Sequence, residues 1–202
     1  MATTFERYQN DSIRIDQYID KMENNQSQFI QNIDQAMIRD EDLAFFKDQQ
    51  LHFLVITEDW CIDSVQFIPV LARLARDNDG IDVGILRKDE NTELAEQYPR
   101  KDGYNAIPIV VVFDGKGNEL GSIIERPEQA SKEMAEETRK FQEAHPDLEG
   151  IKRNIDRMPE ETQKQVKAHS RRWRMTQQDR FADLMLAEVR EIVESGQKEN
   201  AA

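Results

Sequence analysis

Cys61 is the only cysteine in the 202-residue chain, and its thiol is the strongest candidate nucleophile. It lies in the segment 57–64, Thr-Glu-Asp-Trp-Cys-Ile-Asp-Ser, between an apolar run and a stretch with helical periodicity. A thiol at a strand-to-helix turn lies where unpaired helix N–H groups and the helix dipole stabilise a thiolate. The segment therefore predicts either one-thiol chemistry at Cys61 or the frame of a redox protein without its redox function.

The neighbours of Cys61 act on its thiol in opposite directions. Ser64 follows three residues later and can turn its hydroxyl or backbone N–H toward the sulfur. Trp60 would form one side of the site. Glu58, Asp59 and Asp63 bring negative charge near the thiol, and like charge raises a thiol pKa. Glu58 is either a proton acceptor beside Cys61 or a solvated loop carboxylate, and the residues alone leave both interpretations open.

Short apolar runs predict the strands that position these side chains. Residues 51–56 and 81–86 are rich in β-branched or aliphatic residues, and a helix-like stretch, 65–76, separates them. This strand–helix–strand order is typical of a parallel sheet. Two further runs, 109–113 and 120–124, flank a turn rich in Asp, Gly and Asn and predict a hairpin.

Helical patterns flank the strands on both sides. Residues 1–49 are predicted to form an N-terminal helical extension that packs on the core, with breaks at 24–25 and 39–42. We expect the strand-bearing domain to span 50–148, and 149–202 to form a C-terminal helical extension. The C-terminal part includes one long helix from 160 to 194, because its apolar residues recur at helical spacing.

The order of strand, Trp60-Cys61, helix, strand and Ala106-Ile107-Pro108 resembles the thioredoxin-like superfamily. It is most similar to bacterial thioredoxin family proteins with a Thr-Glu-Asp-Trp-Cys entry to the active-site helix, over roughly residues 45–130. The resemblance implies an α/β fold with a mixed sheet of about four strands flanked by helices. It also implies that a cis peptide bond joins Ile107 to Pro108 and that Pro108 faces the sulfur. Trp60, Ile107 and Pro108 would then shape the substrate groove.

Two residues depart from the thioredoxin pattern. Ser64 occupies the place of the resolving cysteine, so a dithiol–disulfide cycle cannot run within one molecule. Asp63 stands where thioredoxins usually have proline or a small residue. The Cys-x-x-Ser spacing resembles single-thiol glutaredoxins, in which glutathione or another external thiol resolves the mixed disulfide, although their Cys-Gly-Phe-Ser segment is missing here.

Three functional hypotheses follow from this pattern. In the first, the protein is a thiol–disulfide oxidoreductase in which Cys61 attacks protein or small-molecule disulfides and Ser64 orients the sulfur. In the second, it is a non-catalytic binding or adaptor module whose groove beside Pro108 holds an extended peptide and whose C-terminal helices form a homodimer. In the third, two copies of Cys61 join in an intermolecular disulfide that senses oxidation.

Charge and composition exclude several other classes. The net charge of −13 argues against nucleic-acid binding, because phosphates would be repelled. No apolar run approaches the roughly 20 residues that a membrane span requires. No basic segment followed by an apolar core opens the chain, and one cysteine cannot form an internal disulfide. We therefore expect a cytoplasmic protein without membrane contact.

No cofactor is expected. The three histidines lie far apart in sequence, and no Cys/His spacing predicts a metal site. No glycine-rich phosphate loop is present. Arg87 and Lys88 either contact an anionic partner such as glutathione's carboxylate or form a surface charge pair. The basic residues between 164 and 180 either dock against an acidic partner or form the solvated face of a helix.

Overall fold

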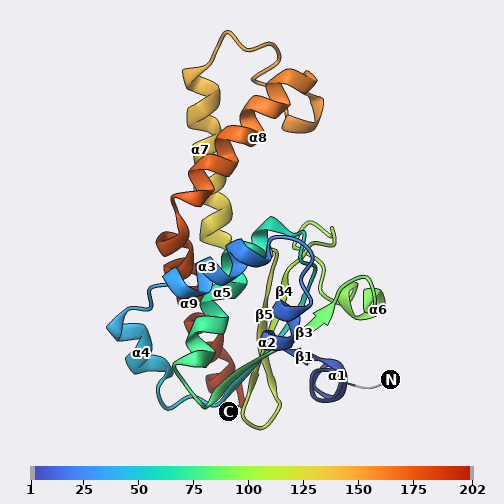
Figure 1. Ribbon diagram of the computed structural model, residues 1–202, viewed down its shortest axis with the longest axis vertical. Coiled ribbons are helices and arrows are strands. Elements are labelled where there is room, and N and C mark those ends of the chain that lie inside the picture. The colour runs from blue at the N-terminus through green and yellow to red at the C-terminus, as the bar shows by residue number, and fades with distance from the viewer. Residues whose placement is uncertain (1–2, 201–202) are drawn as a thin grey trace.

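The computed structural model describes residues 3–200 and has a five-stranded mixed sheet flanked by helices (Figure 1). The predicted α/β fold is therefore confirmed. The strands run in the order β1-β3-β2-β4-β5. Their bounds are β1 Ile13–Arg14, β2 Leu51–Thr57, β3 Ile81–Arg87, β4 Ile109–Asp114 and β5 Glu119–Ile124.

The central part of the sheet has the predicted topology. β2 pairs in parallel with β3 after a crossover through helix α5 (Ile62–Arg76), and β4 and β5 form the antiparallel hairpin beside β2. The fifth strand, β1, was not predicted. Its two residues pair antiparallel with Gly84 and Ile85, and a segment this short shows no alternating pattern in the sequence.

Each face of the sheet is covered by helices. In β2, Phe53 and Val55 point into the larger apolar cluster, whereas Leu54 and Ile56 point into a smaller one on the opposite face. Helices α3 (Gln26–Gln35), α5 and α9 (Gln178–Asn200) contribute to the larger cluster, and α6 (Thr92–Ala95) contributes to the smaller one. This two-sided burial explains why β2 and β4 appear in the sequence as continuous apolar runs.

The remaining helices lie before the sheet and after it. The N-terminal part contains α1 (Thr4–Asp11), α2 (Ile15–Asp20) and α4 (Asp40–Phe46). The predicted break at 39–42 is wrong, because Asp40, Glu41 and Asp42 form the first turn of α4, where negative charge is favoured. The C-terminal part contains α7 (Glu128–Ala144), the short 3₁₀ helix Ile155–Arg157 and α8 (Glu160–Met175).

The predicted single helix over 160–194 is also wrong. The chain leaves the helix at Thr176 and Gln177, and α9 begins at Gln178. The break is needed because α8 packs on α7, whereas α9 packs against β5 and α5. Helices α7 and α8 form a projecting hairpin, residues 128–175, which we call the helical arm (Figure 1).

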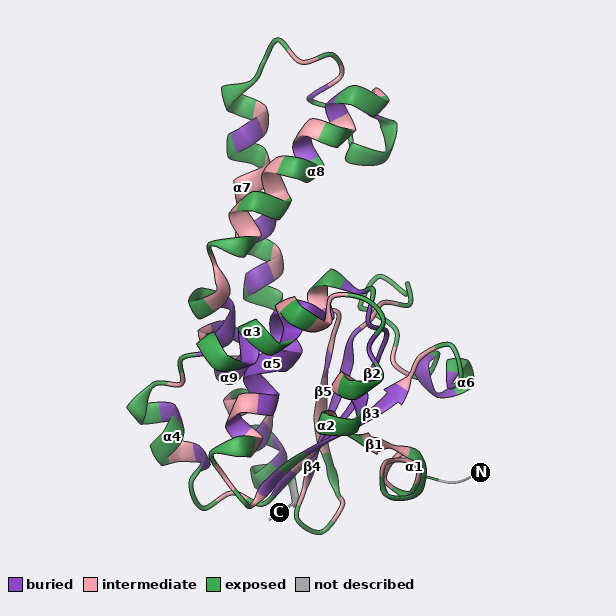
Figure 2. Ribbon diagram, viewed as in Figure 1, coloured by how far each residue is buried: buried purple, intermediate pink, exposed green. Residues whose placement is uncertain are grey.

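The helical arm and the body of the molecule have separate apolar clusters. Phe141, Ile151, Met158 and Val166 pack together within the arm. Buried residues are dense in the strands, α5 and α9, whereas exposed and half-buried residues predominate in the arm (Figure 2). The domain boundaries at 49 and 148 stay a prediction. Within residues 3–200, no helix is long and apolar enough to span a membrane.

Candidate functional site

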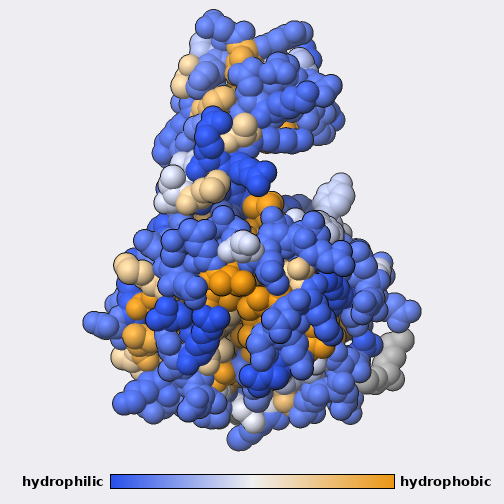
Figure 3. Space-filling view, viewed as in Figure 1, coloured by the Kyte–Doolittle hydropathy of each residue, from blue (hydrophilic) through white to orange (hydrophobic). Residues whose placement is uncertain are grey.

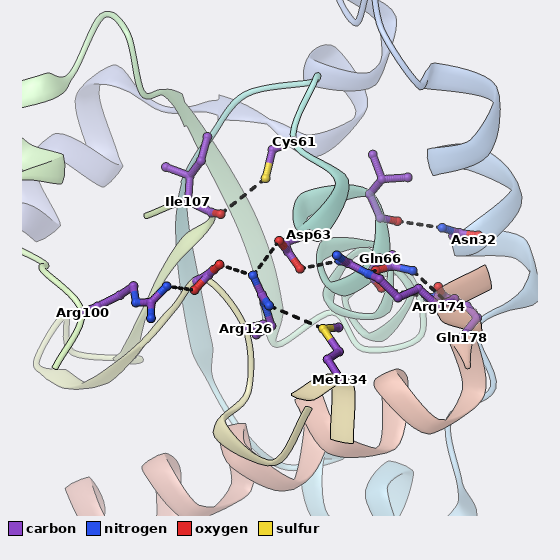
Figure 4. Close-up of polar contacts among 12 residues, drawn as sticks. Asn32, Cys61, Asp63, Gln66, Arg100, Ile107, Arg126, Met134, Arg174 and Gln178 are labelled. Atoms are coloured by element: carbon purple, nitrogen blue, oxygen red, sulfur yellow. Dashed lines mark hydrogen bonds and ion pairs between the residues drawn. The ribbon is translucent and has the colours of Figure 1, made fainter. Parts of the chain in front are cut away.

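Cys61 lies between strand β2 and helix α5. β2 ends at Thr57, a tight turn follows, and Cys61 is the N-cap residue of the helix. Its backbone carbonyl accepts the first helical hydrogen bond, from the N–H of Val65 at 3.2 Å. The residue is 7% exposed and is therefore buried. Its Sγ donates a hydrogen bond to the carbonyl oxygen of Ile107 at 3.4 Å (Figure 4).

The loop that carries Ile107 contains the cis peptide bond that the resemblance implied. The bond joins Ile107 to Pro108, directly before β4. β4 runs antiparallel to β2 with Ile109 opposite Ile56, so this register brings the loop to the end of the sheet where Cys61 lies. Pro108 is buried and Ile107 is half-buried.

Burial decides the acidity of the Cys61 thiol. Loss of hydration raises the pKa of the thiol, and the negative charge of Asp63 acts in the same direction. The hydroxyl and backbone N–H of Ser64 lower it, as does the backbone N–H of Asp63, but burial and the Asp63 charge together outweigh these effects. The helix N-terminus therefore does not produce the stabilised thiolate that its position alone would favour.

Ser64 is one of the least exposed residues of the site, at 1%. Its hydroxyl forms a hydrogen bond with the hydroxyl of Thr57, the last residue of β2. This contact joins the first turn of α5 to the strand that precedes it. The hydroxyl is thus held in the protein interior, away from solvent.

Glu58 is held by β3 and the segment that follows it. Its carboxylate accepts hydrogen bonds from Arg87 at 2.9 Å and from the backbone N–H of Asp89 at 3.0 Å. Among the described residues, no hydrogen bond joins this carboxylate to the Cys61 thiol. The structure therefore pairs Glu58 with Arg87, which gives Arg87 a partner inside the protein.

Asp59 anchors the loop after α2, a role that the sequence analysis did not predict for this carboxylate. Its buried carboxylate accepts hydrogen bonds from the backbone N–H groups of Glu23 and Asn24, at 2.8 and 3.2 Å, and from the Asn24 side chain at 3.0 Å. Burial acts to raise the pKa of Asp59, but these hydrogen bonds outweigh it, so its pKa is lowered. The predicted helix break at Asn24-Asn25 was the only sequence signal of this contact, because the loop after α2 donates these hydrogen bonds to Asp59.

Asp63 connects the active-site helix to two distant arginines. Its carboxylate forms ion pairs with Arg126 at 3.1 Å and with Arg174 at 2.5 Å (Figure 4). Arg174 lies in the last turn of α8 and also donates to the side chain of Gln66 at 2.7 Å. The helical arm is therefore tied to the first turns of α5, an arrangement that the sequence analysis did not predict.

Large apolar side chains are exposed in the segments that contain Cys61 and Ile107. Trp60 is 56% exposed and Tyr104, in the loop that leads to Ile107, is 73% exposed. Ile62 is also exposed. The structure thus brings Trp60, Ile107 and the buried Pro108 to the same end of the sheet as Cys61, as the substrate-groove prediction requires. Their role in binding stays a prediction.

A metal centre has no support in the part of the chain that the structure describes. Within residues 3–200, no group of three or more His, Cys, Asp or Glu side chains is arranged to hold a metal ion.

Comparisons with known proteins point to one family. The family described as Thioredoxin matches residues 12–144. A crystal structure of a protein of unknown function from Pseudomonas aeruginosa is similar, with a TM-score of 0.62 and 18% identity, over 96% of this chain and 98% of that one. An HIV epitope scaffold gives the same values. Identity this low shows a shared fold alone. No curated protein matches this chain.

Proposed function

Since the chain belongs to the thioredoxin family, we propose that it is a thiol–disulfide oxidoreductase that works with one cysteine. The observation that carries this proposal is the Cys61 thiol at the head of α5, within hydrogen-bond distance of the Ile107 carbonyl and beside the cis proline Pro108. The exposed indole of Trp60 offers an apolar contact for a substrate next to that thiol. Protein or small-molecule disulfides are the proposed substrates.

The proposed reaction begins when the Cys61 thiolate attacks one sulfur of a substrate disulfide. The substrate S–S bond breaks, one substrate thiolate leaves, and a mixed disulfide forms on Cys61. Ser64 has no thiol to resolve it, so an external thiol such as glutathione completes the exchange. The Ile107 carbonyl and Trp60 would position the substrate on either side of the sulfur. A cytoplasmic setting, where small thiols stay reduced, belongs to this proposal.

The raised pKa of Cys61 makes the proposed exchange slow and its intermediate persistent. Only a small fraction of a thiol with a raised pKa is ionised near neutral pH, and the thiolate is the nucleophile. A thiol with a high pKa is also a poor leaving group in disulfide exchange. When an external thiol attacks this mixed disulfide, the substrate thiolate would therefore leave more readily than the Cys61 thiolate. Cys61 would then remain in a mixed disulfide with the external thiol.

The direct test is glutathione-dependent reduction of a small disulfide by the purified protein, compared with Cys61→Ala. We expect the wild-type protein to accelerate the reaction and the variant to leave it at the uncatalysed rate. Equal rates for the two proteins would reject catalysis by this thiol. Mass spectrometry of the wild-type protein after oxidised glutathione is added should show the mixed disulfide on Cys61.

A non-catalytic binding module is the second candidate, and the same raised pKa favours it. In that case the groove beside Pro108 would hold an extended peptide without covalent chemistry. A pull-down separates the two functions: a partner that stays bound to Cys61→Ala supports the binding module, whereas a partner lost with the thiol supports exchange.

A further inference from the structure

A cleft lies at the N-terminal end of α5, on the side of the helical arm. Its volume is about 500 Å³, within the range of small-molecule sites. Helices α3, α5, α7, α8 and α9 supply its lining, and Ile62, the residue after Cys61, belongs to its wall. Figure 3 shows the indentation that separates the arm from the body on this face. The cleft thus lies at the same end of α5 as Cys61, although Cys61 is not one of its lining residues.

The lining of this arm-side cleft is unusual for so acidic a chain. The protein has 40 acidic residues and a net charge of −13, yet none of the residues that line the cleft is acidic. The lining instead combines side-chain amides with cations. The amides include Asn32, Gln66 and Gln178, and the cations are Lys167, Arg171 and Arg174.

The three cations differ in how their charge is balanced. Arg174 is paired with Asp63 at 2.5 Å, so its charge is largely neutralised. Lys167 and Arg171 are exposed, and no carboxylate among residues 3–200 lies within ion-pair distance of either. Lys167 donates only to the neutral side chain of Gln163, at 3.2 Å. Two cations without acidic partners therefore face the cleft.

The amides supply a different kind of contact. Gln66 and Arg174 bond each other, and Gln178 donates to the Gln66 carbonyl at 2.8 Å, so this wall is fixed (Figure 4). The amides of α3, Gln31 and Gln35 among them, face the same cleft. Side-chain amides both donate and accept hydrogen bonds, which suits the amide groups of a peptide-like molecule.

We propose that the arm-side cleft binds the external thiol, which is a peptide-sized thiol that carries carboxylates. This inference rests on the proposed single-cysteine exchange, which requires such a thiol. Lys167 and Arg171 attract the carboxylates, and the amides hydrogen-bond the peptide-like part. Because the rest of the acidic surface repels anions, a local positive cleft also concentrates the thiol beside Cys61.

The exchange balances with two molecules of this thiol. The first, as its thiolate, attacks the Cys61 sulfur of the mixed disulfide, the S–S bond breaks and the substrate thiolate leaves. The second attacks the new mixed disulfide at the small-thiol sulfur, which releases the Cys61 thiolate. Two external thiols are oxidised to one disulfide, the substrate disulfide is reduced to two thiols, and the two protons end on the substrate sulfurs.

The kinetic test compares glutathione with its diethyl ester, which has the same thiol and no carboxylates. The variant is Lys167→Ala/Arg171→Ala, and the control is Arg172→Ala, an exposed arginine of the same helix outside the cleft lining. We expect the double variant to raise KM for glutathione about five- to tenfold and to leave KM for the ester unchanged. The control should leave both values unchanged.

The outcomes separate this inference from the proposed function. If Cys61-dependent reduction occurs and the double variant does not change KM for glutathione, the cleft assignment is wrong and the exchange function stands. If neither thiol supports reduction, the exchange function fails. Binding is then measured alone, by calorimetry with S-methylglutathione, which cannot exchange. Weaker binding to the double variant than to Arg172→Ala supports the cleft, and equal or absent binding overturns it.

Discussion

The thiol of Cys61 is under two opposed influences, and the structure shows which is larger. Its position at the head of α5 favours the thiolate, as does Ser64, but burial and Asp63 favour the neutral thiol. The sequence contains both sets of residues and cannot rank them, because the outcome depends on how much water the neighbouring loop at Ile107 excludes. The raised pKa distinguishes this site from one that is prepared for fast exchange.

Alkylation should report this raised pKa directly. The thiolate is the reactive form, so the rate with iodoacetamide should rise with pH and still be rising above pH of about 8.5, the value for an ordinary cysteine. The rate constant is measured by mass spectrometry from pH 6 to 10, with an unstructured cysteine peptide as the control. A plateau below the pH at which the peptide levels off would contradict the assigned direction of the shift.

Replacing Ser64 by cysteine should change the chemistry of the site. Residues three apart at the start of a helix have Cα atoms roughly 5 Å apart, a separation that a disulfide can span. Ser64→Cys should therefore form an internal disulfide with Cys61 and lose two hydrogen atoms in mass on oxidation. The control is Ser64→Ala, which should not. A Ser64→Cys protein that keeps two free thiols under oxidising conditions would show that the buried position prevents pairing.

The sequence indicates those features of the candidate site that the local backbone defines. The strand-to-helix turn at Cys61 and the proline loop at Pro108 are local in sequence and have clear patterns, and the structure brings them together. The partners of Asp59 and Asp63 come from residues 23–24, 126 and 174. No pattern in a single sequence indicates contacts between segments this far apart.

At the level of elements, the sequence predicts what has a long and regular pattern. β2, β3, β4 and β5 were identified because their apolar runs are continuous or bounded by turn residues. β1 has only two residues, and the break between α8 and α9 at Thr176 carries no glycine or proline. Tertiary packing decides both features: β1 forms because β3 offers an edge, and α9 turns because the sheet offers an apolar face.

The anchoring of the loop after α2 gives a prediction at this scale. Asp59→Ala removes a buried acceptor of three hydrogen bonds and should lower the free energy of unfolding by about 1–3 kcal/mol at pH 7. Urea denaturation measures the change. The control is Asp16→Ala, an exposed carboxylate paired only with Arg14, which should be nearly neutral.

The same variant has a pH signature with a defined sign. Folding lowers the pKa of Asp59, so its contribution is present above the unfolded value of about 3.9 and is lost as pH falls through the folded pKa. The difference in stability between wild type and Asp59→Ala should therefore shrink between pH 5 and pH 3. A difference that stays constant over this range would exclude the lowered pKa.

Over the whole molecule, the main core and the separate small cluster of the arm predict two levels of stability. Phe181 of α9 is fully buried against Phe67 and Trp173 in the main core, so Phe181→Ala should cost about 3–5 kcal/mol in global stability. Phe141 lies in the small cluster of the arm. Phe141→Ala should mainly loosen the arm.

Hydrogen exchange distinguishes these two outcomes. After Phe141→Ala, amides in α7 and α8 should exchange faster while those in β2 and β4 keep their protection. After Phe181→Ala, protection should fall in the sheet as well. Uniform loss of protection in both variants would mean that the arm and the body unfold as one cooperative unit.

The late position of α9 along the chain has a consequence for biosynthesis. The sheet is complete in sequence at Ile124, but Val193, a fully buried residue of its cover, follows 69 residues later (193 − 124). At bacterial-type elongation rates of about 5–20 residues per second, translation of that interval takes roughly 3 to 14 seconds. For that time the part of the sheet that α9 covers, chiefly β5, stays exposed on the nascent polypeptide.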